Sequence, residues 1–115
     1  MISVWYTLNS KGHKLRINGH ADYDTGGRDI VCAAVSSISF ALLGFLENNG
    51  WETSDYYHQR DSGYLTIVSC ESPKVNAAFE MAVIGLMQIA NKYPDNVKVN
   101  ISATGGDSRE ETANY

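Results

Sequence analysis

The spacing of apolar residues changes along the chain between the period of a strand and that of a helix, in an order that leaves few folds open. Apolar and polar residues alternate, as in strands, over residues 2–8, 13–20, 53–60, 64–70 and 97–103. Apolar residues recur at helical spacing over about 30–48 and about 73–92. The order ββαββαβ favours an α+β two-layer sandwich, in which two helices pack on one mixed or antiparallel sheet.

Turn and cap residues separate these segments. Residues 9–12 (Asn-Ser-Lys-Gly) and 61–63 (Asp-Ser-Gly) are typical of tight turns, so each is expected to join two strands in a hairpin. Ser72 is a favoured N-cap residue, and Pro73 suits the first position of the helix that follows. These two residues therefore define the start of the second helix more sharply than its apolar spacing does.

The faces of these elements follow from the same pattern. In the second strand, Leu15 and Ile17 share one face, and Lys14, Arg16 and Asn18 share the other. The first helix is expected to bury a stripe formed by Ile30, Ala34, Val35, Ile38, Leu42, Phe45 and Leu46. Helices on one side leave the other side of the sheet bare. The aromatic residues Trp5, Tyr56 and Tyr57 suggest that a partner covers it.

Length and composition suit a single cytosolic domain. Residues 1–104 of the 115-residue chain are expected to form one α+β domain, with 105–115 as a polar tail without ordered structure. The first residues lack the basic start and apolar core of a signal peptide. No apolar run approaches the ~20 residues that a membrane helix needs. We therefore expect a cytoplasmic protein without a membrane partner, and two reduced cysteines.

The net charge bears on the class of partner. A formal charge of −4 argues against nucleic acid as the main partner, and no direct contact with nucleic acid is expected. The same charge suits a basic protein or peptide substrate.

The stretch from Gly19 to Ser36 holds the residues best suited to chemistry. Asp29 is a favoured N-cap residue after a glycine pair, which would place Cys32 in the first helical turn, one turn before Ser36. A cysteine there can form a thiolate, and His20 at the end of the preceding strand could exchange a proton with it. The alternative is that Cys32 is a small buried core residue and His20 an ordinary polar residue.

A metal site is the other chemistry that this stretch suggests. His20, Asp22 and Asp24 alternate as cation ligands can. A second nearby histidine is missing, however, because His13 and His58 lie in other segments. The glycine pairs of the chain are also too short to form phosphate-binding loops. We therefore expect neither a metal nor another cofactor.

The segment Gly19-His20-Ala21, followed at 29–36 by Asp-Ile-Val-Cys-Ala-Ala-Val-Ser, closely resembles the signature of the ribosomal-processing cysteine proteases (Prp). The resemblance extends over essentially the whole chain. It implies a cysteine endopeptidase that removes a short N-terminal extension from a large-subunit ribosomal protein. It also implies that the protein forms a homodimer.

The resemblance assigns roles residue by residue. His20 and Cys32 would form the catalytic dyad, with Gly19, Asp29 and Ser36 in support. His20 would take the thiol proton, and Cys32 would then attack the scissile carbonyl to give an acyl-enzyme. First-turn amides, that of Cys32 among them, would stabilise the oxyanion. Asp29 would either cap the helix or orient His20. Because the family's cleavage sites follow aromatic-rich segments, an apolar groove is expected beside Cys32.

Two other functions stay open at this stage. A phage-type relative would trim a capsid or scaffold protein with the same chemistry. A non-catalytic module associated with the ribosome or with RNA would need a basic face, for which Lys11, Lys14, Arg16 and Arg28 are the candidates.

Overall fold

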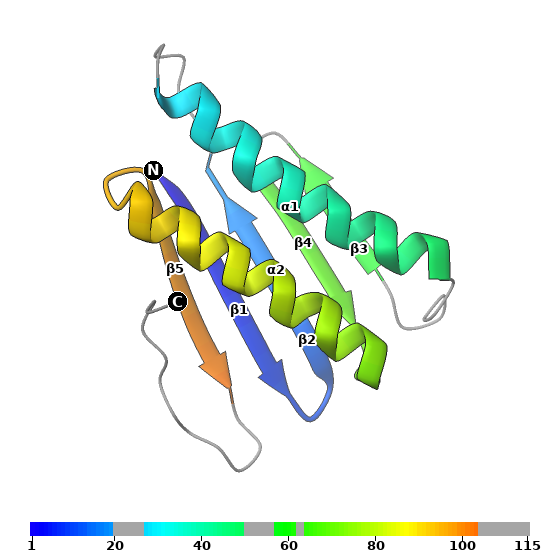
Figure 1. Cartoon of the computed structure of the whole chain (residues 1–115). Coiled ribbons are helices and arrows are strands. Elements are labelled where there is room, and N and C mark those ends of the chain that lie inside the picture. Colours follow the sequence, from blue (N-terminus) through cyan, green and yellow to red (C-terminus); the bar gives the residue numbers. More distant parts are fainter. Residues whose placement is uncertain (20–26, 50–56, 62–63, 104–115) are drawn as a thin grey trace.

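Two helices lie side by side over one sheet in the computed structural model of the chain (Figure 1). The structure describes residues 1–19, 27–49, 57–61 and 64–103, with side chains except at 27–29, 57–61, 64 and 103. In chain order the elements are β1 (Ile2–Asn9), β2 (Gly12–Asn18), α1 (Gly27–Asn49), β3 (Tyr57–Asp61), β4 (Tyr64–Ser69), α2 (Pro73–Lys92) and β5 (Val97–Ala103). The predicted order ββαββαβ is confirmed. The predicted tail at 105–115 lies outside the described residues and stays a prediction.

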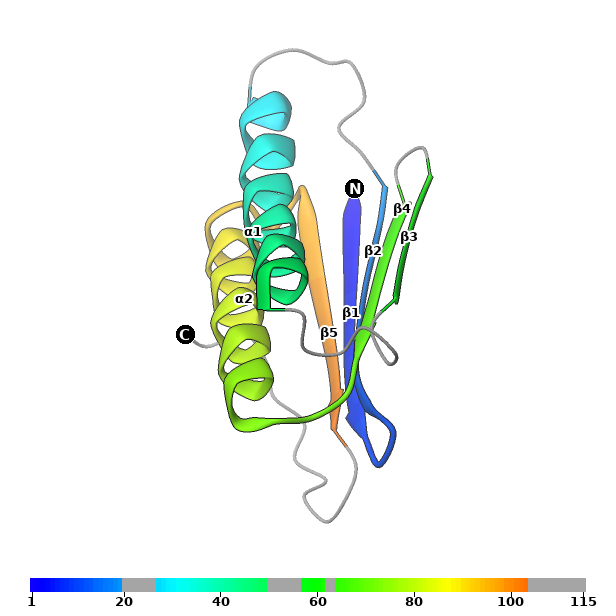
Figure 2. The same ribbon diagram turned by 90° about the vertical axis from the view of Figure 1, so that its right-hand side faces the viewer.

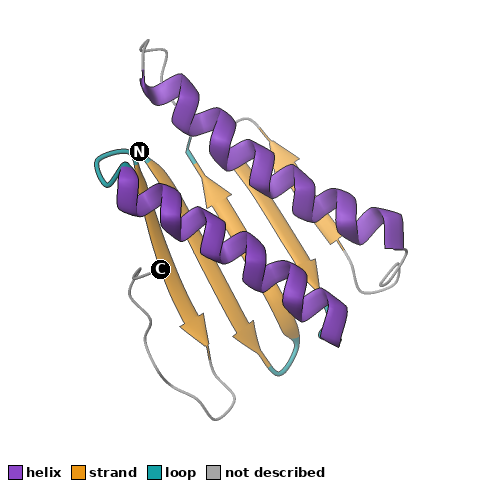
Figure 3. Cartoon of the chain, in the orientation of Figure 1, coloured by secondary structure: helices purple, strands orange, loops and turns teal. Residues whose placement is uncertain are grey.

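The sheet has five strands in the order β3-β4-β2-β1-β5. The β1–β2, β2–β4 and β3–β4 pairs are antiparallel, whereas β5 lies parallel to β1, so the sheet is mixed. Figure 2 shows both helices on the same side of the sheet, and Figure 3 shows how they cross its strands. The predicted α+β two-layer sandwich is therefore confirmed, and none of the described residues forms a helix on the other face of the sheet.

The core fills the space between the helices and the sheet. Leu15 and Ile17 point into it, as the alternation of β2 predicts, while Lys14, Arg16 and Asn18 are exposed. The fully buried side chains include Val4, Leu15, Val31, Leu46, Ile67, Val75, Phe79, Leu86 and Met87. At the start of α2, the hydroxyl of Ser72 accepts a hydrogen bond from the amide of Val75 at 3.3 Å, with Pro73 at the first helical position. The predicted cap of this helix is confirmed.

The predicted start and buried stripe of α1 need correction. The helix begins at Gly27 and not at about residue 30. Ile30 is 64% exposed, whereas its neighbour Val31 is 1% exposed and belongs to the core. The stripe that faces the sheet passes through Val31, Val35, Leu42 and Leu46, because Ile30 lies on the flank of the helix.

The expectation about long apolar runs was also wrong for α1. Residues Ile30–Asn49 have a mean hydropathy of 2.0, which is enough by length and composition alone for a membrane span. Serines and a glycine interrupt the apolar residues, but the mean hydropathy stays high because isoleucine, leucine, valine and phenylalanine dominate the segment. The buried third of this segment packs on the sheet as a core helix does.

Candidate active site

Cys32 lies in the second turn of α1, as its sixth residue, and its side chain is half-buried. The amide of a residue at this depth bonds the carbonyl four positions earlier, so Cys32 cannot offer its own N–H to an oxyanion. That expected role was wrong, because the helix starts earlier than the sequence indicated. Side chains in a helix lean toward its N-terminus, so the thiol still projects back toward the first turn.

Asp29 is the third residue of α1, so the prediction that it is the N-cap was wrong. Aspartate is favoured both at the cap and within the first turn, where its charge complements the helix dipole, and the sequence did not distinguish the two positions. The side chain of Asp29 lies outside the described residues. Of its two predicted roles, orienting His20 is the one that remains.

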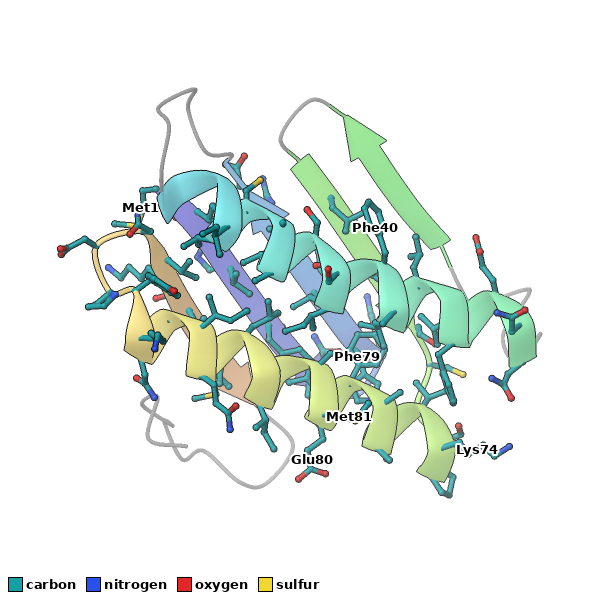
Figure 4. All side chains as sticks on the ribbon, turned by 45° about the horizontal axis from the view of Figure 1, so that its top comes forward. Met1, Phe40, Lys74, Phe79, Glu80 and Met81 are labelled. Atoms are coloured by element: carbon teal, nitrogen blue, oxygen red, sulfur yellow. The ribbon has the colours of Figure 1, made fainter. Side chains whose placement is uncertain are left out.

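Ser36 and Phe40 continue the side of α1 on which Cys32 lies. They follow Cys32 by four and eight residues, a spacing that brings all three to one face of the helix. Ser36 is half-buried, and the ring of Phe40 is 42% exposed. Figure 4 shows Phe40 on the side of α1 that faces β3 and β4, away from α2. An exposed aromatic ring therefore stands about 12 Å along the helix axis from Cys32.

Gly19 fixes how the chain leaves β2 immediately before His20. Its φ is +107°, a backbone conformation that side chains other than glycine rarely adopt. A Cβ atom at this position would collide with the carbonyl oxygen of Met1, so the close approach of the two backbones also requires glycine. The end of β2 and the start of α1 lie at the same end of the molecule (Figures 1 and 2).

His20 itself lies outside the described residues, as do Asp22 and Asp24. The structure therefore places the exit of β2 at the same end of the molecule as the start of α1, which carries Cys32, without placing the imidazole. Within the part of the chain that is described, no group of three or more His, Cys, Asp or Glu residues could hold a metal ion. Cys32 and Cys70 form no disulfide with each other.

A buried histidine that sequence reasoning passed over lies at the opposite end of β2. His13 is 2% exposed, and its ring stacks on Phe79 with a centroid distance of 4.4 Å. Its Nε2 lies 2.6 Å from Asn76 Oδ1, and its Nδ1 lies 2.6 Å from the Tyr6 hydroxyl. Because the Asn76 oxygen can only accept, Nε2 donates to it, and neutral His13 accepts the Tyr6 proton at Nδ1.

This network joins β1, β2 and α2 and is structural. Burial lowers the pKa of His13, although its hydrogen bond to Asn76 opposes the shift. Burial also raises the pKa of Tyr6 to about 12, so the phenol stays protonated and can donate. The alternation of buried and exposed residues along β2 could have predicted that His13 is buried, because it shares the face of Leu15 and Ile17.

An apolar groove of about 540 Å³ runs between α1 and α2. Its walls include Ile38 and Phe45 from α1 and Ala77 and Met81 from α2. Neither Cys32 nor Ser36 lines it, so this is not the groove that was expected beside the thiol. On the described part of that side of α1, the exposed apolar surface is the ring of Phe40.

Known proteins resemble the chain in sequence and structure. The sequence pattern of the family described as cysteine protease Prp matches residues 1–98. The ribosomal processing cysteine protease Prp of Staphylococcus aureus is 27% identical over 104 residues, which cover 87% of this chain and 98% of the relative. Its counterpart in Mycoplasma genitalium is 32% identical over 93 residues, covering 81% and 92%.

Solved structures agree with these matches. The S. aureus Prp in complex with a substrate peptide superposes with a TM-score of 0.75 at 26% identity, covering 89% of this chain and all of that one. A Streptococcus mutans protein superposes with a TM-score of 0.74 at 26% identity, covering 90% and 96%. With the family pattern matched over residues 1–98 and the fold shared, the chain belongs to the Prp family of cysteine proteases.

Proposed function

We propose that this protein is a cytoplasmic endopeptidase that removes a short N-terminal extension from a large-subunit ribosomal protein. The observation that carries the proposal is the family match over residues 1–98, which includes the whole Gly19–Ser36 stretch. The relatives from S. aureus and M. genitalium are named ribosomal processing proteases. The acidic net charge of −4 is compatible with a basic substrate such as a ribosomal protein.

The reaction assigned to the site is nucleophilic acyl transfer by Cys32. His20 takes the proton from Sγ, and the thiolate attacks the scissile carbonyl carbon. The tetrahedral intermediate then collapses to a thioester, and the leaving amine takes the proton from His20. Water, deprotonated by His20, hydrolyses the thioester and restores the thiol. A structure of the S. aureus Prp with a covalently linked product peptide supports a covalent mechanism in this family.

The oxyanion donors that we propose are the first amides of α1, at residues 27–29. These amides have no partner within the helix, and they carry the positive end of its dipole. The side chain of Cys32 leans back toward them. Loss of one such donor typically lowers turnover by ~10²–10³-fold.

Asp29 is the positioning residue that we propose for His20. We expect Asp29→Asn to lower kcat severely with little change in melting temperature, because an amide favours the wrong imidazole tautomer. We expect Asp29→Glu to restore part of the turnover, and the pH dependence of kcat to move with the substitution. A fully active Asp29→Asn enzyme would leave Asp29 with a structural role only.

The peptide is expected to run past Cys32 along the side of α1 that carries Ser36 and Phe40. The exposed ring of Phe40 can receive an apolar or aromatic side chain of the substrate. The backbone of the peptide could pair with an exposed edge of the sheet, where β3 and β5 are the terminal strands.

We also propose that the protein is a homodimer, joined through the groove between α1 and α2. Apolar side chains line this groove, and Met81 on its wall is 73% exposed. Exposed apolar surface of this kind marks protein interfaces. Light scattering should give a dimer for the native chain and a monomer for Met81→Glu. Glu80→Lys is the matched control, because Glu80 points away from α1 (Figure 4). A native monomer at micromolar concentration would contradict the interface.

The function is tested with synthetic peptides that cover the N-terminal extension of the host ribosomal protein. Mass spectrometry should find one defined cut, which Cys32→Ala and Cys32→Ser abolish while the circular dichroism spectrum stays native. A capsid or scaffold peptide cut in place of the ribosomal one would assign the chain to the phage type. Turnover retained in Cys32→Ala would exclude the thiol mechanism.

A further inference from the structure

Over β1, β2 and β5, the face of the sheet that the described helices leave bare is polar and basic. Alternation sends Ile2 and Val4 of β1 into the core, so Ser3, Trp5 and Thr7 point to the opposite side. The register of β1 with β2 and β5 adds the residues that pair with these three, which are Lys14, Arg16, Asn18, Lys98, Asn100 and Ser102. Figure 2 shows that both described helices lie on the opposite side of the sheet.

The described charged side chains on β1, β2 and β5 are all cationic. Lys14, Arg16 and Lys98 lie on the bare face, and all three are exposed. The described carboxylate side chains lie on the helices or on the segments that join them to strands, at Glu47, Glu71, Glu80 and Asp95. The part of the bare face over β1, β2 and β5 is therefore positive, although the whole chain carries a formal charge of −4.

An aromatic and cationic pair stands at the centre of this face. The guanidinium of Arg16 lies over the ring of Trp5, with 5.7 Å between Cζ and the ring centroid, and Trp5 is 39% exposed. Together with Thr7 and Lys14, the pair lines a shallow depression of about 190 Å³. Indole rings and guanidinium planes are the surfaces on which unstacked bases rest in proteins that bind single strands.

The two lysines flank this pair. Lys98 pairs with Ser3 on one side of Trp5, and Lys14 pairs with Thr7 on the other. With strands ~4.8 Å apart and ~3.3 Å per residue along a strand, the two Cα atoms are separated by about 16 Å. Their ammonium groups can therefore contact phosphates on either side of a base that is stacked on the pair.

We propose that the bare face of the sheet, centred on Trp5, Arg16, Lys14 and Lys98, binds single-stranded RNA. The protein would thereby hold RNA on the side of the sheet opposite to the helix that carries Cys32. An acidic protein could pair with the three cations, but such a partner does not require the exposed indole that is paired with the guanidinium. Single-stranded RNA uses both features, through phosphate contacts and base stacking.

The test is the binding of a fluorescein-labelled 12-nucleotide oligouridine to the full chain, followed by anisotropy at several salt concentrations. The native protein should bind with a Kd that weakens as salt rises. Lys14→Gln with Lys98→Gln should weaken binding about tenfold or more and lower the salt slope by about 1.4, since each phosphate contact contributes ~0.7 on a single strand. Trp5→Thr, which keeps a strand-forming residue, should weaken binding ~10-fold or more through lost stacking.

Lys92→Gln is the matched control, because Lys92 is exposed on the last turn of α2, in the helical layer. It removes one positive charge and should leave both Kd and the salt slope within twofold of the native values. Peptide cleavage, measured in the same variants, should be unchanged, so failure of RNA binding is separable from failure of the protease.

Four results would overturn the proposal. One is native protein that binds oligouridine with no dependence on salt. Another is equal weakening by Lys92→Gln and by the Lys14 and Lys98 substitutions. The third is a change of oligomeric state in Trp5→Thr, which would show that a second copy of the chain covers this face. Displacement of the RNA by polyglutamate at equal charge concentration would favour an acidic protein as the occupant.

Discussion

Replacement of Gly19 by alanine should impair catalysis without touching a reacting atom. Gly19 is the last described residue before His20, and it holds φ at +107° against the backbone of Met1. Alanine adds only a methyl group, so any change in activity must come from the path of the backbone. The substitution therefore tests whether the exit from β2 positions the catalytic histidine.

The cost in stability follows from the backbone geometry. A residue other than glycine at such a φ is destabilised by about 1–3 kcal/mol. The collision of its Cβ with the Met1 carbonyl oxygen also forces the two segments apart. For a chain of this length each kcal/mol corresponds to roughly 3–5 °C, so the melting temperature should fall by about 3–15 °C.

The cost in catalysis follows from the position of Gly19 in the chain. A displacement of ~1 Å next to a catalytic group can lower the rate by ~10²-fold, because the reacting atoms leave their attack geometry. We expect kcat/KM for the extension peptide to fall by about that factor at a temperature where the variant is fully folded. Circular dichroism at the assay temperature checks that condition.

Gly12→Ala is the matched control. Gly12 has φ +116°, and a Cβ atom there would collide with the carbonyl oxygen of Ser69, so the strain is of the same kind. It lies at the other end of β2, about 23 Å from Gly19. Gly12→Ala should lose similar stability and keep its turnover. Equal turnover in the two folded variants would refute the positioning role of Gly19.

Three further predictions concern the two cysteines, Phe40 and His13. Cys32 should react with iodoacetamide faster than Cys70 at pH 7. Both side chains are half-buried, so a faster rate at Cys32 would reflect an activated thiol and not greater exposure. Equal rates would contradict activation of Cys32. Phe40→Ala should raise KM for the peptide about three- to ninefold with kcat unchanged, given the 42% of the ring that a substrate can still bury, whereas Met81→Ala in the other groove should not. Burial lowers the pKa of His13 below 6.5, so the folded state favours the neutral imidazole and the protein loses stability as pH falls below 6.5. Between pH 7.5 and pH 5, the urea midpoint of His13→Gln should therefore decline less than that of the native protein.

Strand parity was the most reliable information in the sequence. It predicted which residues of β2 enter the core, because a strand that is buried on one face tolerates no slip of register. Extended two residues back from Leu15, it would also have placed His13 in the core. The hydrogen bonds of His13 to Tyr6 and Asn76 could not be predicted, since Asn76 is 63 residues away in the chain.

The start of α1 was the least predictable feature of the site. Two adjacent glycines usually disfavour a helix, and the sequence therefore pointed to Asp29 as the cap. In the structure Gly27 is already helical, which moves Cys32 from the first turn to the second. Local propensity cannot report such an extension, because packing of the rest of the helix stabilises its weak first turn.

The three surfaces proposed for substrate, partner subunit and RNA do not compete for the same side of the molecule. Cys32 and Ile38 are six residues apart on α1, which separates their directions about the helix axis by about 120°. A second copy seated in the groove at Ile38 would therefore leave the side of Cys32, Ser36 and Phe40 accessible. The bare face of the sheet lies behind both helices. One dimer could thus present two thiols on its flanks and two basic sheets on its outer faces.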